Sequence, residues 1–513
     1  MVQFSAFIVY FALMLGIGIY FFLRDRSKSD ADYFLGGRQM GPWVTAMSAQ
    51  ASDMSGWLLM GFPGSILAFG LGQVWIGIGL AIGTIANWVL VARRLRRFSA
   101  ASGDAITLPQ YLTNRFATAN PALKIACAVI FLISFTIYVA SAFNAGTAVF
   151  TKVIPGLVGK EILAMAIFAA IVLVYTFLGG YKAVCWTDFF QGIMMLCALL
   201  LVPIVMAVGG DFEPELTGAF KEGVTEFGSN PFKASFGEVV SGLGWGLGYF
   251  GMPHILVRFM AIKDASMVKK SAIVASAWVV LSLGAAVAIA ILGRTFLLSD
   301  GVAIADKLLP GNQQNIFIEI VVDIFPSFIT GILLAAIIAA SMSTADSQLL
   351  VASSAFTSDL YQPMIRKGKA TERETLWVGR IVVAAVTLIA FVIAATGVGK
   401  ADSWASNIMA MVENAWGLFG AAFGPVVILS LFWRRFNYAG ALAGIIAGAV
   451  VDLVWLFALT GVTGVYEIVP GFIAGAIAAI VATLATAEPS AEVTDIYDAA
   501  VAEIAAESAK NVD

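Results

Sequence analysis

The sequence predicts an all-α protein that crosses a membrane many times. Sixty per cent of its 513 residues are hydrophobic and only 12% are charged. Apolar runs of about twenty residues, the length that crosses a bilayer as a helix, recur along nearly the whole chain. Polar residues and glycines interrupt two of these runs, which predicts how the helices are arranged. No polar block is long enough for a soluble domain, so we expect one transmembrane domain over residues 1–486.

Thirteen spans are predicted, and the ninth is unusual. The expected bounds are 4–23, 42–68, 70–92, 123–150, 161–180, 187–208, 236–261, 272–297, 315–357, 376–396, 406–433, 438–460 and 466–486. The ninth run is too long for one crossing, so we expect its part before Pro326 to be a surface or loop helix. We expect the first run to be retained, because no basic stretch precedes it and no small-residue cleavage site follows it.

The distribution of Lys and Arg predicts the orientation. With the N-terminus outside, the inner loops and tail, including residues 258–271, carry 21 Lys and Arg, and the outer loops carry seven. Because positively charged loops stay in the cytoplasm, we expect an outside N-terminus and an inside C-terminus in the plasma (inner) membrane. The net charge of −3 averages the two sides and gives no indication of a nucleic-acid partner.

Two interrupted spans predict an inverted repeat. The second span is broken at residues 51–56 by the string ASDMSG. The seventh span holds a series of helix-breaking residues, namely Gly242, Gly244, Gly246, Gly248, Gly251 and Pro253. The breaks lie five spans apart, and because five is odd, units over 42–208 and 236–433 enter the membrane from opposite faces. Such paired breaks are typical of secondary transporters with a midplane site, although membrane helices are also glycine-rich for close packing.

Asp53 is the leading functional candidate in the second span. An ionisable side chain inside a span is disfavoured by roughly 3 kcal/mol, so it normally faces a cavity and handles an ion, a proton or a substrate. The alternative is a carboxylate satisfied by backbone amides at the break. Both explanations require a broken helix, because non-helical backbone at membrane depth is tolerated only in a cavity or within protein.

The ninth span carries a polar string that predicts a cation site. Residues 341–348 (SMSTADSQ) place Ser343 and Ser347 one helical turn apart, with Asp346 on the adjoining face. Hydroxyl and carbonyl oxygens are hard ligands that suit an alkali cation, and an unwound second span would supply free carbonyls. The alternative is that the hydroxyls bond to carbonyls four residues earlier in their own helix.

Aromatic residues flank glycines at both breaks. Trp245 and Tyr249 share a helix face with Gly248 beside them, and Trp57 stacks on Gly61. Aromatic walls around a glycine gap suit a compact solute with an apolar ring and an ammonium. Ordinary helix packing explains the same spacing.

The remaining polar residues indicate no enzyme. Asp188 stands at the start of the sixth span, where capping of the helix is favoured over ion coordination. His254 is either a satisfied helix-end residue or a proton relay. The three cysteines lack metal-ligand spacing and are expected to be reduced packing residues. Because no nucleophile with a base, phosphate loop or metal quartet is present, we expect neither catalysis nor a cofactor.

These motifs resemble the sodium/solute symporter family. The matching strings are YFLGGR at 33–38, ASDMSGWLLMG at 51–61, WGLGYFGMPHIL at 245–256 and MST at 342–344. The resemblance runs from about residue 10 to residue 485, and its second- and seventh-span strings are typical of the proline branch. It implies a LeuT-like five-plus-five fold with one extra helix before it (4–23) and two after it (438–486). It also implies L-proline uptake coupled to sodium.

The resemblance assigns residues to each role. The implied sodium site uses carbonyls of Ala51, Met54 and Ala340 and hydroxyls of Ser343 and Thr344, and Asp53 and Ser55 would be required nearby for ion affinity. The implied proline pocket consists of Trp57, Gly61, Tyr138, Trp245, Tyr249 and Pro253. Arg38 and Asp188 match residues tied to coupling, Asp188 sometimes to a second cation site.

Three features depart from the family pattern. Glu413 and Asn414 precede Trp416 where neutral small or aromatic residues are expected, which points to a different coupling ion or a side-chain pair. Asp346 has no assigned role. The acidic segment 487–513 has none either, and we expect it to be a short solvated cytoplasmic helix or disordered.

The predicted function is sodium-driven uptake of L-proline by alternating access, with sodium as co-transported ligand. The nearer alternatives are a related symporter for another small carboxylate or amine, or one driven by protons or lithium. A membrane-embedded sensor is a rival from another class, but the 27 residues after the last span are too few for a kinase. An ion channel would not need two interrupted repeats. The sequence leaves the ion stoichiometry and the oligomeric state open.

Overall fold

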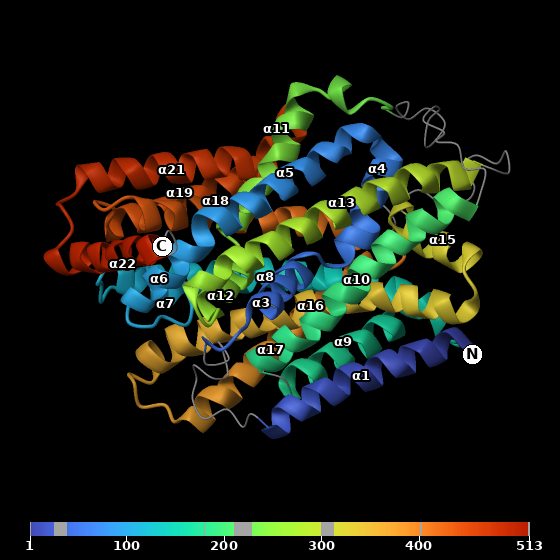
Figure 1. Cartoon of the computed structure of the whole chain (residues 1–513), viewed down its shortest axis with the longest axis horizontal. Helices are drawn as coiled ribbons and strands as arrows, with labels where there is room; N and C mark the ends of the chain where they lie inside the picture. Colours follow the sequence, from blue (N-terminus) through green and yellow to red (C-terminus); the bar gives the residue numbers. More distant parts are fainter. Residues whose placement is uncertain are drawn as a thin grey trace.

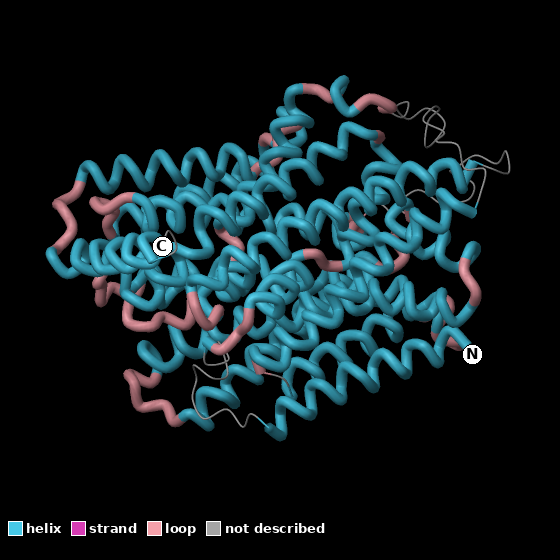
Figure 2. Tube along the Cα trace, in the orientation of Figure 1, coloured by secondary structure: helices cyan, strands magenta, loops and turns pink. Residues whose placement is uncertain are grey.

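The computed structural model describes residues 2–24, 38–178, 180–209, 228–298, 312–400 and 403–510. Within these ranges the regular structure is helical, apart from one isolated bridge between Met40 and Ile262. Most long helices run along the long axis of the molecule (Figure 1), and loops join them mainly at its two ends (Figure 2). Ten of the described helices are long and apolar enough to cross a membrane. The predicted all-α membrane architecture is therefore confirmed.

The first half of the chain contains the first six predicted spans, and the second of them is broken. The bounds are α1 (Val2–Arg24), α3 (Pro42–Asp53), the π-helical turn η2 (Trp57–Gly61), α4 (Phe62–Phe69), α5 (Val74–Ala86), the π-helical turn η4 (Asn87–Ala92), α6 (Arg93–Ala101), α7 (Leu108–Arg115), α8 (Ala122–Val153), α9 (Glu161–Leu178) and α10 (Tyr181–Gly209).

The second half again begins with a broken span. The bounds are α11 (Phe236–Gly244), the 3-10 turn η6 (Trp245–Phe250), α12 (Pro253–Ala261), α13 (Val268–Leu298), α15 (Ile316–Ile324), α16 (Ser327–Phe356) with the π-helical η9 (Thr357–Ile365), α17 (Glu372–Gly397), α18 (Ile408–Phe432), α19 (Tyr438–Ala458), the single turn α20 (Thr460–Thr463), α21 (Ile468–Ala485) and α22 (Ala491–Lys510). Each predicted span thus has a counterpart in the described part of the chain.

The ninth span divides at a proline, as the sequence predicts. Residue Phe325 is extended, and α16 starts immediately after Pro326. The preceding helix α15 is separate. Its apolar face is buried and packs against α13 and α4, while Val322 and Asp323 are exposed. Helix α15 thus fits the expected surface or loop helix, and its apolar face packs within the protein.

Side-chain caps fix where two central helices begin. At α11, Ser235 Oγ accepts a hydrogen bond from the Glu238 amide at 3.2 Å, and Glu238 Oε2 accepts one from the Ser235 amide at 2.7 Å. At α18, Asn407 Oδ1 accepts from the Ala410 amide at 3.1 Å. These contacts satisfy amides that have no partner within the helix. The two helix starts are thereby held in defined positions.

The broken spans lie inside the bundle. Helix α3 packs against α10, α12, α13 and α16, and η6 packs against α5 and α18. Of the membrane-spanning segments of α16 and α18, 83% of the residues are buried, against 28% for α1, α19 and α21. The most enclosed helices are therefore the ones that face the two breaks.

Glycines allow backbone-to-backbone contact between α5 and the second broken span. A Cβ atom on Gly79 would overlap the Gly242 carbonyl, and one on Gly83 would overlap the Gly246 carbonyl. Because backbone atoms cannot rotate out of the way as side chains do, glycine is required at these positions. The glycines of the seventh span therefore serve close helix packing, the structural explanation left open above.

The acidic C-terminal segment is a docked helix. In α22, the Asp498 carboxylate accepts two hydrogen bonds from the Arg434 guanidinium at 2.8 and 2.7 Å, which lowers the pKa of Asp498. Tyr497 packs edge-on against Phe98 of α6 with ring centroids 5.3 Å apart. Of the two expectations, a short solvated helix or disorder, the helix is present over Ala491–Lys510. One face is exposed, and the other, which includes the fully buried Ala500, docks on the protein.

We predict that Gly83→Ala destabilises the protein by about 1–3 kcal/mol, because the added methyl group collides with backbone that cannot repack. Thermal unfolding of purified protein in detergent measures the effect. Gly284→Ala in α13 is the control, since a Cβ there meets nothing within 4 Å, and alanine favours a helix over glycine by about 1 kcal/mol. Equal melting temperatures for Gly83→Ala and unaltered protein would contradict the proposed close packing.

Candidate functional site

The second span unwinds directly after Asp53. Met54 has φ −83° and ψ 76°, which is not helical, and the chain returns to a helical turn only at Trp57. In a continuous helix the Ser55 amide would bond to the Ala51 carbonyl. It bonds instead to the Asp53 carbonyl at 3.0 Å. The Ala51 carbonyl is therefore available to other groups.

Two hydroxyls of α16 lie next to the Ala51 carbonyl. Ser343 Oγ donates to the Ala51 carbonyl at 2.7 Å and lies 3.1 Å from the Ala340 carbonyl, and Thr344 Oγ1 lies 3.5 Å from the Ala51 carbonyl. Four of the five residues implied for sodium are thus brought together. Met54, the fifth, lies buried in the break, and no hydrogen bond among the described residues joins it to α16.

Only part of the polar string follows the alternative of bonding within its own helix. Ser341 Oγ donates to the Ile337 carbonyl four residues earlier, at 2.9 Å. Ser343 reaches across to α3 instead. The two hydroxyls differ because they lie on different faces of α16, and only that of Ser343 meets the unwound turn.

Asp53 connects the two broken spans. Its Oδ2 accepts a hydrogen bond from the Tyr249 hydroxyl of η6 at 2.6 Å. Its carbonyl accepts from the Tyr138 hydroxyl at 3.1 Å and from Trp57 Nε1 at 3.3 Å. The carboxylate is fully buried, and Oδ1 has no hydrogen-bond partner among the described residues. A tyrosine rather than backbone amides therefore satisfies the carboxylate, so the alternative considered for Asp53 is wrong.

Aromatic rings form a continuous wall beside Asp53. The ring centroids of Trp57 and Trp245 are 6.3 Å apart, those of Trp245 and Trp416 are 6.4 Å apart and stacked, and those of Tyr249 and Trp416 are 5.0 Å apart. Trp416 Nε1 donates to the Trp245 carbonyl at 2.7 Å. These rings are at most 2% exposed. Indole and phenol groups from three segments thus enclose one volume.

The gap beside Gly248 does not hold a solute. A Cβ on Gly248 would overlap the indole of Trp416, so this glycine makes room for a side chain of α18. The sequence interpretation of an open gap at this position is wrong. Trp416 is the residue that sequence reasoning missed, and its only signal was its place next to the unexpected Glu413.

Pro253 and Gly61 have mainly structural contacts. Pro253 is the first residue of α12 and follows the extended residue Met252, a position that proline favours. A Cβ on Gly61 would lie 3.4 Å from the Cβ of Met409, so this glycine lets η2 approach α18. Ser55 lies within the break, where its Oγ is 3.4 Å from the Trp57 amide.

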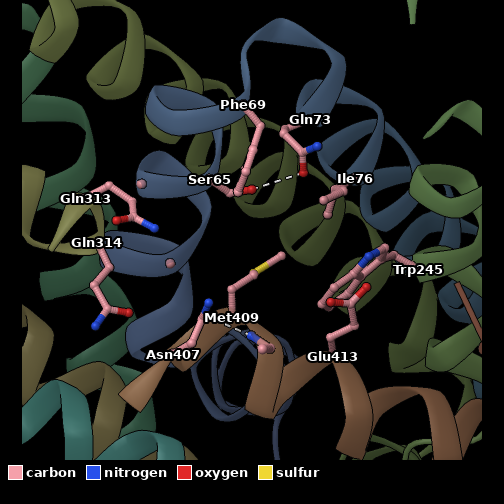
Figure 3. A pocket seen from close by; sticks show the side chains of 13 residues that line it. Ser65, Phe69, Gln73, Ile76, Trp245, Gln313, Gln314, Asn407, Met409 and Glu413 are labelled. Carbon is pink, nitrogen blue, oxygen red and sulfur yellow. Dashed lines mark hydrogen bonds between the residues drawn. The ribbon is translucent and has the colours of Figure 1, made fainter. Parts of the chain in front are cut away.

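A cavity of about 310 Å³ adjoins this wall (Figure 3). Its lining comes from η2, α4, the 3-10 turns η3 (Leu71–Gln73) and η8 (Gln313–Asn315), α5, η6 and the start of α18, and comprises Gly61, Gly64, Ser65, Phe69, Gln73, Ile76, Trp245, Gln313, Gln314, Asn407, Met409, Ala410 and Glu413. Two residues of the implied proline pocket, Gly61 and Trp245, line it. The other four, Trp57, Tyr138, Tyr249 and Pro253, do not line this cavity.

Asp188 belongs to a separate buried network. Its Oδ2 accepts from the Ser48 hydroxyl at 2.7 Å and from Arg258 Nη2 at 3.0 Å, and both members of this ion pair are at most 1% exposed. The same guanidinium donates to Ser347 Oγ at 2.6 Å. Helix α10 begins at Tyr181, so Asp188 lies within the helix and does not cap it. The capping prediction is therefore wrong.

Arg258 was placed in a cytoplasmic loop by the sequence analysis, and this is also wrong. It lies inside α12, where its Nη1 donates to the His254 carbonyl at 2.6 Å. Asp346 is fully buried in α16 next to this network, and neither of its carboxylate oxygens has a hydrogen-bond partner in the described part of the chain. Sequence distance hid the pairing, because 70 residues separate Asp188 and Arg258.

Arg38 lies apart from both clusters. Its Nη2 donates to the Ala105 carbonyl at 3.0 Å and lies 3.4 Å from Asp104 Oδ1, and its φ of 54° is left-handed. These contacts anchor the chain before α3 to the loop after α6. The other residues of the matching string at 33–37 lie outside the described residues.

The chain matches the Sodium:solute symporter family over residues 33–448. The Sodium/proline symporter of Escherichia coli (strain K12) is 43% identical over 487 residues, which cover 94% of this chain and 93% of that protein. The High-affinity proline transporter PutP of Bacillus subtilis (strain 168) is 41% identical, with 94% and 98% covered. The Osmoregulated proline transporter OpuE of the same organism is 42% identical, with 94% of each covered.

Solved structures share the fold. A Na+-coupled sialic acid symporter in a substrate-bound outward-open state aligns with a TM-score of 0.75 at 21% identity, over 96% of this chain and 98% of that one. MhsT in complex with L-phenylalanine aligns with a TM-score of 0.52 at 15% identity, over 86% and 97%. The fold is that of the LeuT-like membrane transporters. More specifically, the chain belongs to the sodium:solute symporter family.

We predict that Arg258→Met destabilises the protein by about 3–5 kcal/mol, because it leaves Asp188 buried without its cation. Thermal unfolding in detergent measures the loss. The double variant Arg258→Met with Asp188→Asn should recover part of it, because Asp188 is then neutral and needs no cation. If the two substitutions instead lower stability additively, the ion pair is not the reason for the loss.

Proposed function

We propose that this protein imports L-proline by symport with sodium. The observation that carries the proposal is the unwound turn after Asp53, which frees the Ala51 carbonyl for Ser343 and Thr344 of α16. The names of the full-length relatives, sodium/proline symporters and proline transporters, supply the solute. The chain would use the two breaks as its transport site.

Sodium would bind between α3 and α16. The ligands would be the carbonyls of Ala51, Met54 and Ala340 and the hydroxyls of Ser343 and Thr344. Both hydroxyls would rotate their hydrogens away from the carbonyls, so that lone pairs face the ion. All of these ligands are oxygens, which a hard cation prefers. Asp53 would favour the cation electrostatically from one residue away.

Proline would bind against the aromatic wall. Trp57, Trp245 and Tyr249 offer apolar faces to the ring, with Tyr138, Gly61 and Pro253 completing the pocket. The N-terminal end of the helical segment that follows the break carries partial positive charge, which would attract the carboxylate of the solute. Because the Tyr249 hydroxyl bonds to Asp53, it would couple binding of the solute to the ion site.

The sodium gradient suffices for accumulation. One cation moving across about 100 mV releases ~2.3 kcal/mol, and a tenfold concentration gradient adds ~1.4 kcal/mol. One ion per solute would therefore sustain a solute gradient of about five-hundred-fold.

The orientation and domain limits follow the sequence analysis. We propose a transporter domain over 1–486, with the repeats at 42–208 and 236–433, and a cytoplasmic segment over 487–513. With the N-terminus outside, the end of α4 and the starts of α11 and α18 lie at the outer face. The cavity that these segments border would then open to the outside, as in a carrier ready to receive solute. Arg38 and Asp188 would act at the inner side, in coupling.

Transport itself is the first test. We expect proteoliposomes containing the purified protein to accumulate radiolabelled L-proline when an inward sodium gradient is imposed, and more strongly with a negative interior potential. Lithium and proton gradients replace sodium in parallel samples, and unlabelled amines and carboxylates compete in others. Uptake driven equally by protons without sodium, or displaced better by another solute, would reject this ion or this solute.

The ion site is the second test. Ser343→Ala removes a proposed sodium ligand and Asp53→Asn removes the nearby charge, so we expect each to raise the sodium concentration for half-maximal uptake at least about tenfold, as for loss of a charge-assisted contact. Ser341→Ala is the matched control, because that hydroxyl bonds within its own helix. A sodium dependence that all three variants share with the unaltered protein would remove Asp53 and Ser343 from the ion site.

A further inference from the structure

The cavity beside Trp245 has one charged group in its lining. Among the described residues that line it, Glu413 is the only ionisable one, and no Lys or Arg accompanies it. The other polar lining groups are amides and a hydroxyl, and several are held in place. Ser65 donates to Gln73 Oε1 at 3.0 Å, and the Gln314 amide group donates to the Ser406 carbonyl at 3.1 Å. The cavity is therefore a built site whose one ionisable group is a carboxyl group.

The Glu413 carboxylate stands beside the Trp245 ring (Figure 3). Tyr466 contacts both residues. The Tyr466 hydroxyl donates to the Glu413 carbonyl at 2.7 Å, and the Tyr466 ring packs on Trp245 with centroids 5.2 Å apart. No hydrogen bond or ion pair in the described part of the chain engages the carboxylate itself. The Glu413 carboxyl group and the aromatic face of Trp245 thus border the same cavity.

Two further carboxyl groups lie behind this pair. Asp452 and Glu467 are buried at 0% and 1% exposure, and no described cation pairs with either of them. Asp452 sits close to the α18 backbone, 3.1 Å from the position of a Cβ on Gly417. A cation bound in the cavity would favour the ionised form of carboxyl groups near it.

The ligand chemistry follows from these groups. A bare metal ion needs several converging oxygens, and the described residues contain no group of three His, Cys, Asp or Glu side chains that could hold one. A carboxylate next to an indole face suits an organic ammonium, which gains both a charge-assisted hydrogen bond and a cation–π contact. Met409 and Ile76 supply apolar surface for an attached ring.

We propose that Glu413 and Trp245 form a reception site that binds the ammonium of the amino-acid solute in this cavity. The inference rests on the proposed function, and it assigns Glu413 as the residue that selects for a protonated amine. Trp245 and Gly61 belong both to the cavity and to the implied proline pocket, so a solute held at Glu413 already touches the wall of the inner site.

The test compares solutes that differ only in the ammonium. Tetrahydrofuran-2-carboxylate has the ring and carboxylate of proline but an oxygen in place of the amine. For E413Q we expect the KM for L-proline uptake to rise about tenfold, as for loss of a charge-assisted hydrogen bond. Inhibition by the oxygen analogue should become stronger or stay the same, since a repulsive charge is removed. The sodium concentration for half-maximal uptake should not change.

Three controls make the outcome decisive. E413D keeps the charge and should keep a KM within a few-fold of the unaltered protein. Asp323→Asn removes an exposed carboxylate of α15 that does not line the cavity, and should change nothing. On the unaltered protein, L-proline methyl ester, which keeps the ammonium and masks the carboxylate, should inhibit uptake more strongly than the oxygen analogue.

The two proposals fail differently. If the unaltered protein takes up no proline with sodium, the proposed function is wrong. If it does, but E413Q leaves KM unchanged or weakens proline and the oxygen analogue equally, only the reception site is wrong. Should neither Glu413 variant assemble, stronger inhibition by the oxygen analogue than by the ester would still overturn it.

Discussion

The unwound turn after Asp53 is the constraint on which the rest of the site depends. A backbone polar group without a partner costs several kcal/mol where water is absent. Side chains satisfy this turn: Ser343 of α16 bonds to the Ala51 carbonyl, and Tyr138 of α8 and Trp57 of the same broken span bond to the Asp53 carbonyl. Each of these residues is placed by the break, and the break is stable only because they are present.

Two buried carboxylates are stabilised by different partners. Asp188 is neutralised by Arg258 of α12, within a network of hydroxyls from α3 and α16. No ion pair in the described part of the chain engages Asp53, which relies on the Tyr249 hydroxyl and keeps one oxygen without a partner. A site that handles a cation needs such an incomplete shell, because a fully paired carboxylate would have nothing to gain from the ion.

Much of this architecture was accessible from the sequence, because the strongest signals are local. Apolar runs of bilayer length identify spans, and a polar string such as ASDMSG inside a run marks a break wherever the remaining chain goes. The polar string around Ser343 and Thr344 marks candidate ligands in the same way, and the family resemblance supplies their neighbour Ala51. Features that depend on the composition of one span were therefore accessible from the sequence.

The failures all concern partners that are distant along the chain. Arg258 looked like a loop cation because its position at the end of a span fits that role, and only the fold brings Asp188 to it. The open gap at Gly248 was inferred from one helix, while the residue that fills it comes from α18. The docking of α22 depends on Arg434 and Phe98, which have no sequence relation to the tail.

The glycines of η6 have a mechanical consequence. A Cβ at Gly246 would meet the backbone of α5, one at Gly251, directly after η6, would meet the backbone of α18, and one at Gly248 would meet the Trp416 indole of α18. At Gly246 and Gly251 the backbones therefore touch without intervening side chains that could change rotamer and let them slip. The segment η6 must therefore move together with α5 and α18 as one rigid unit. Any rocking motion that opens the site to each side of the membrane in turn must take place at other helix interfaces, where longer side chains separate the helices.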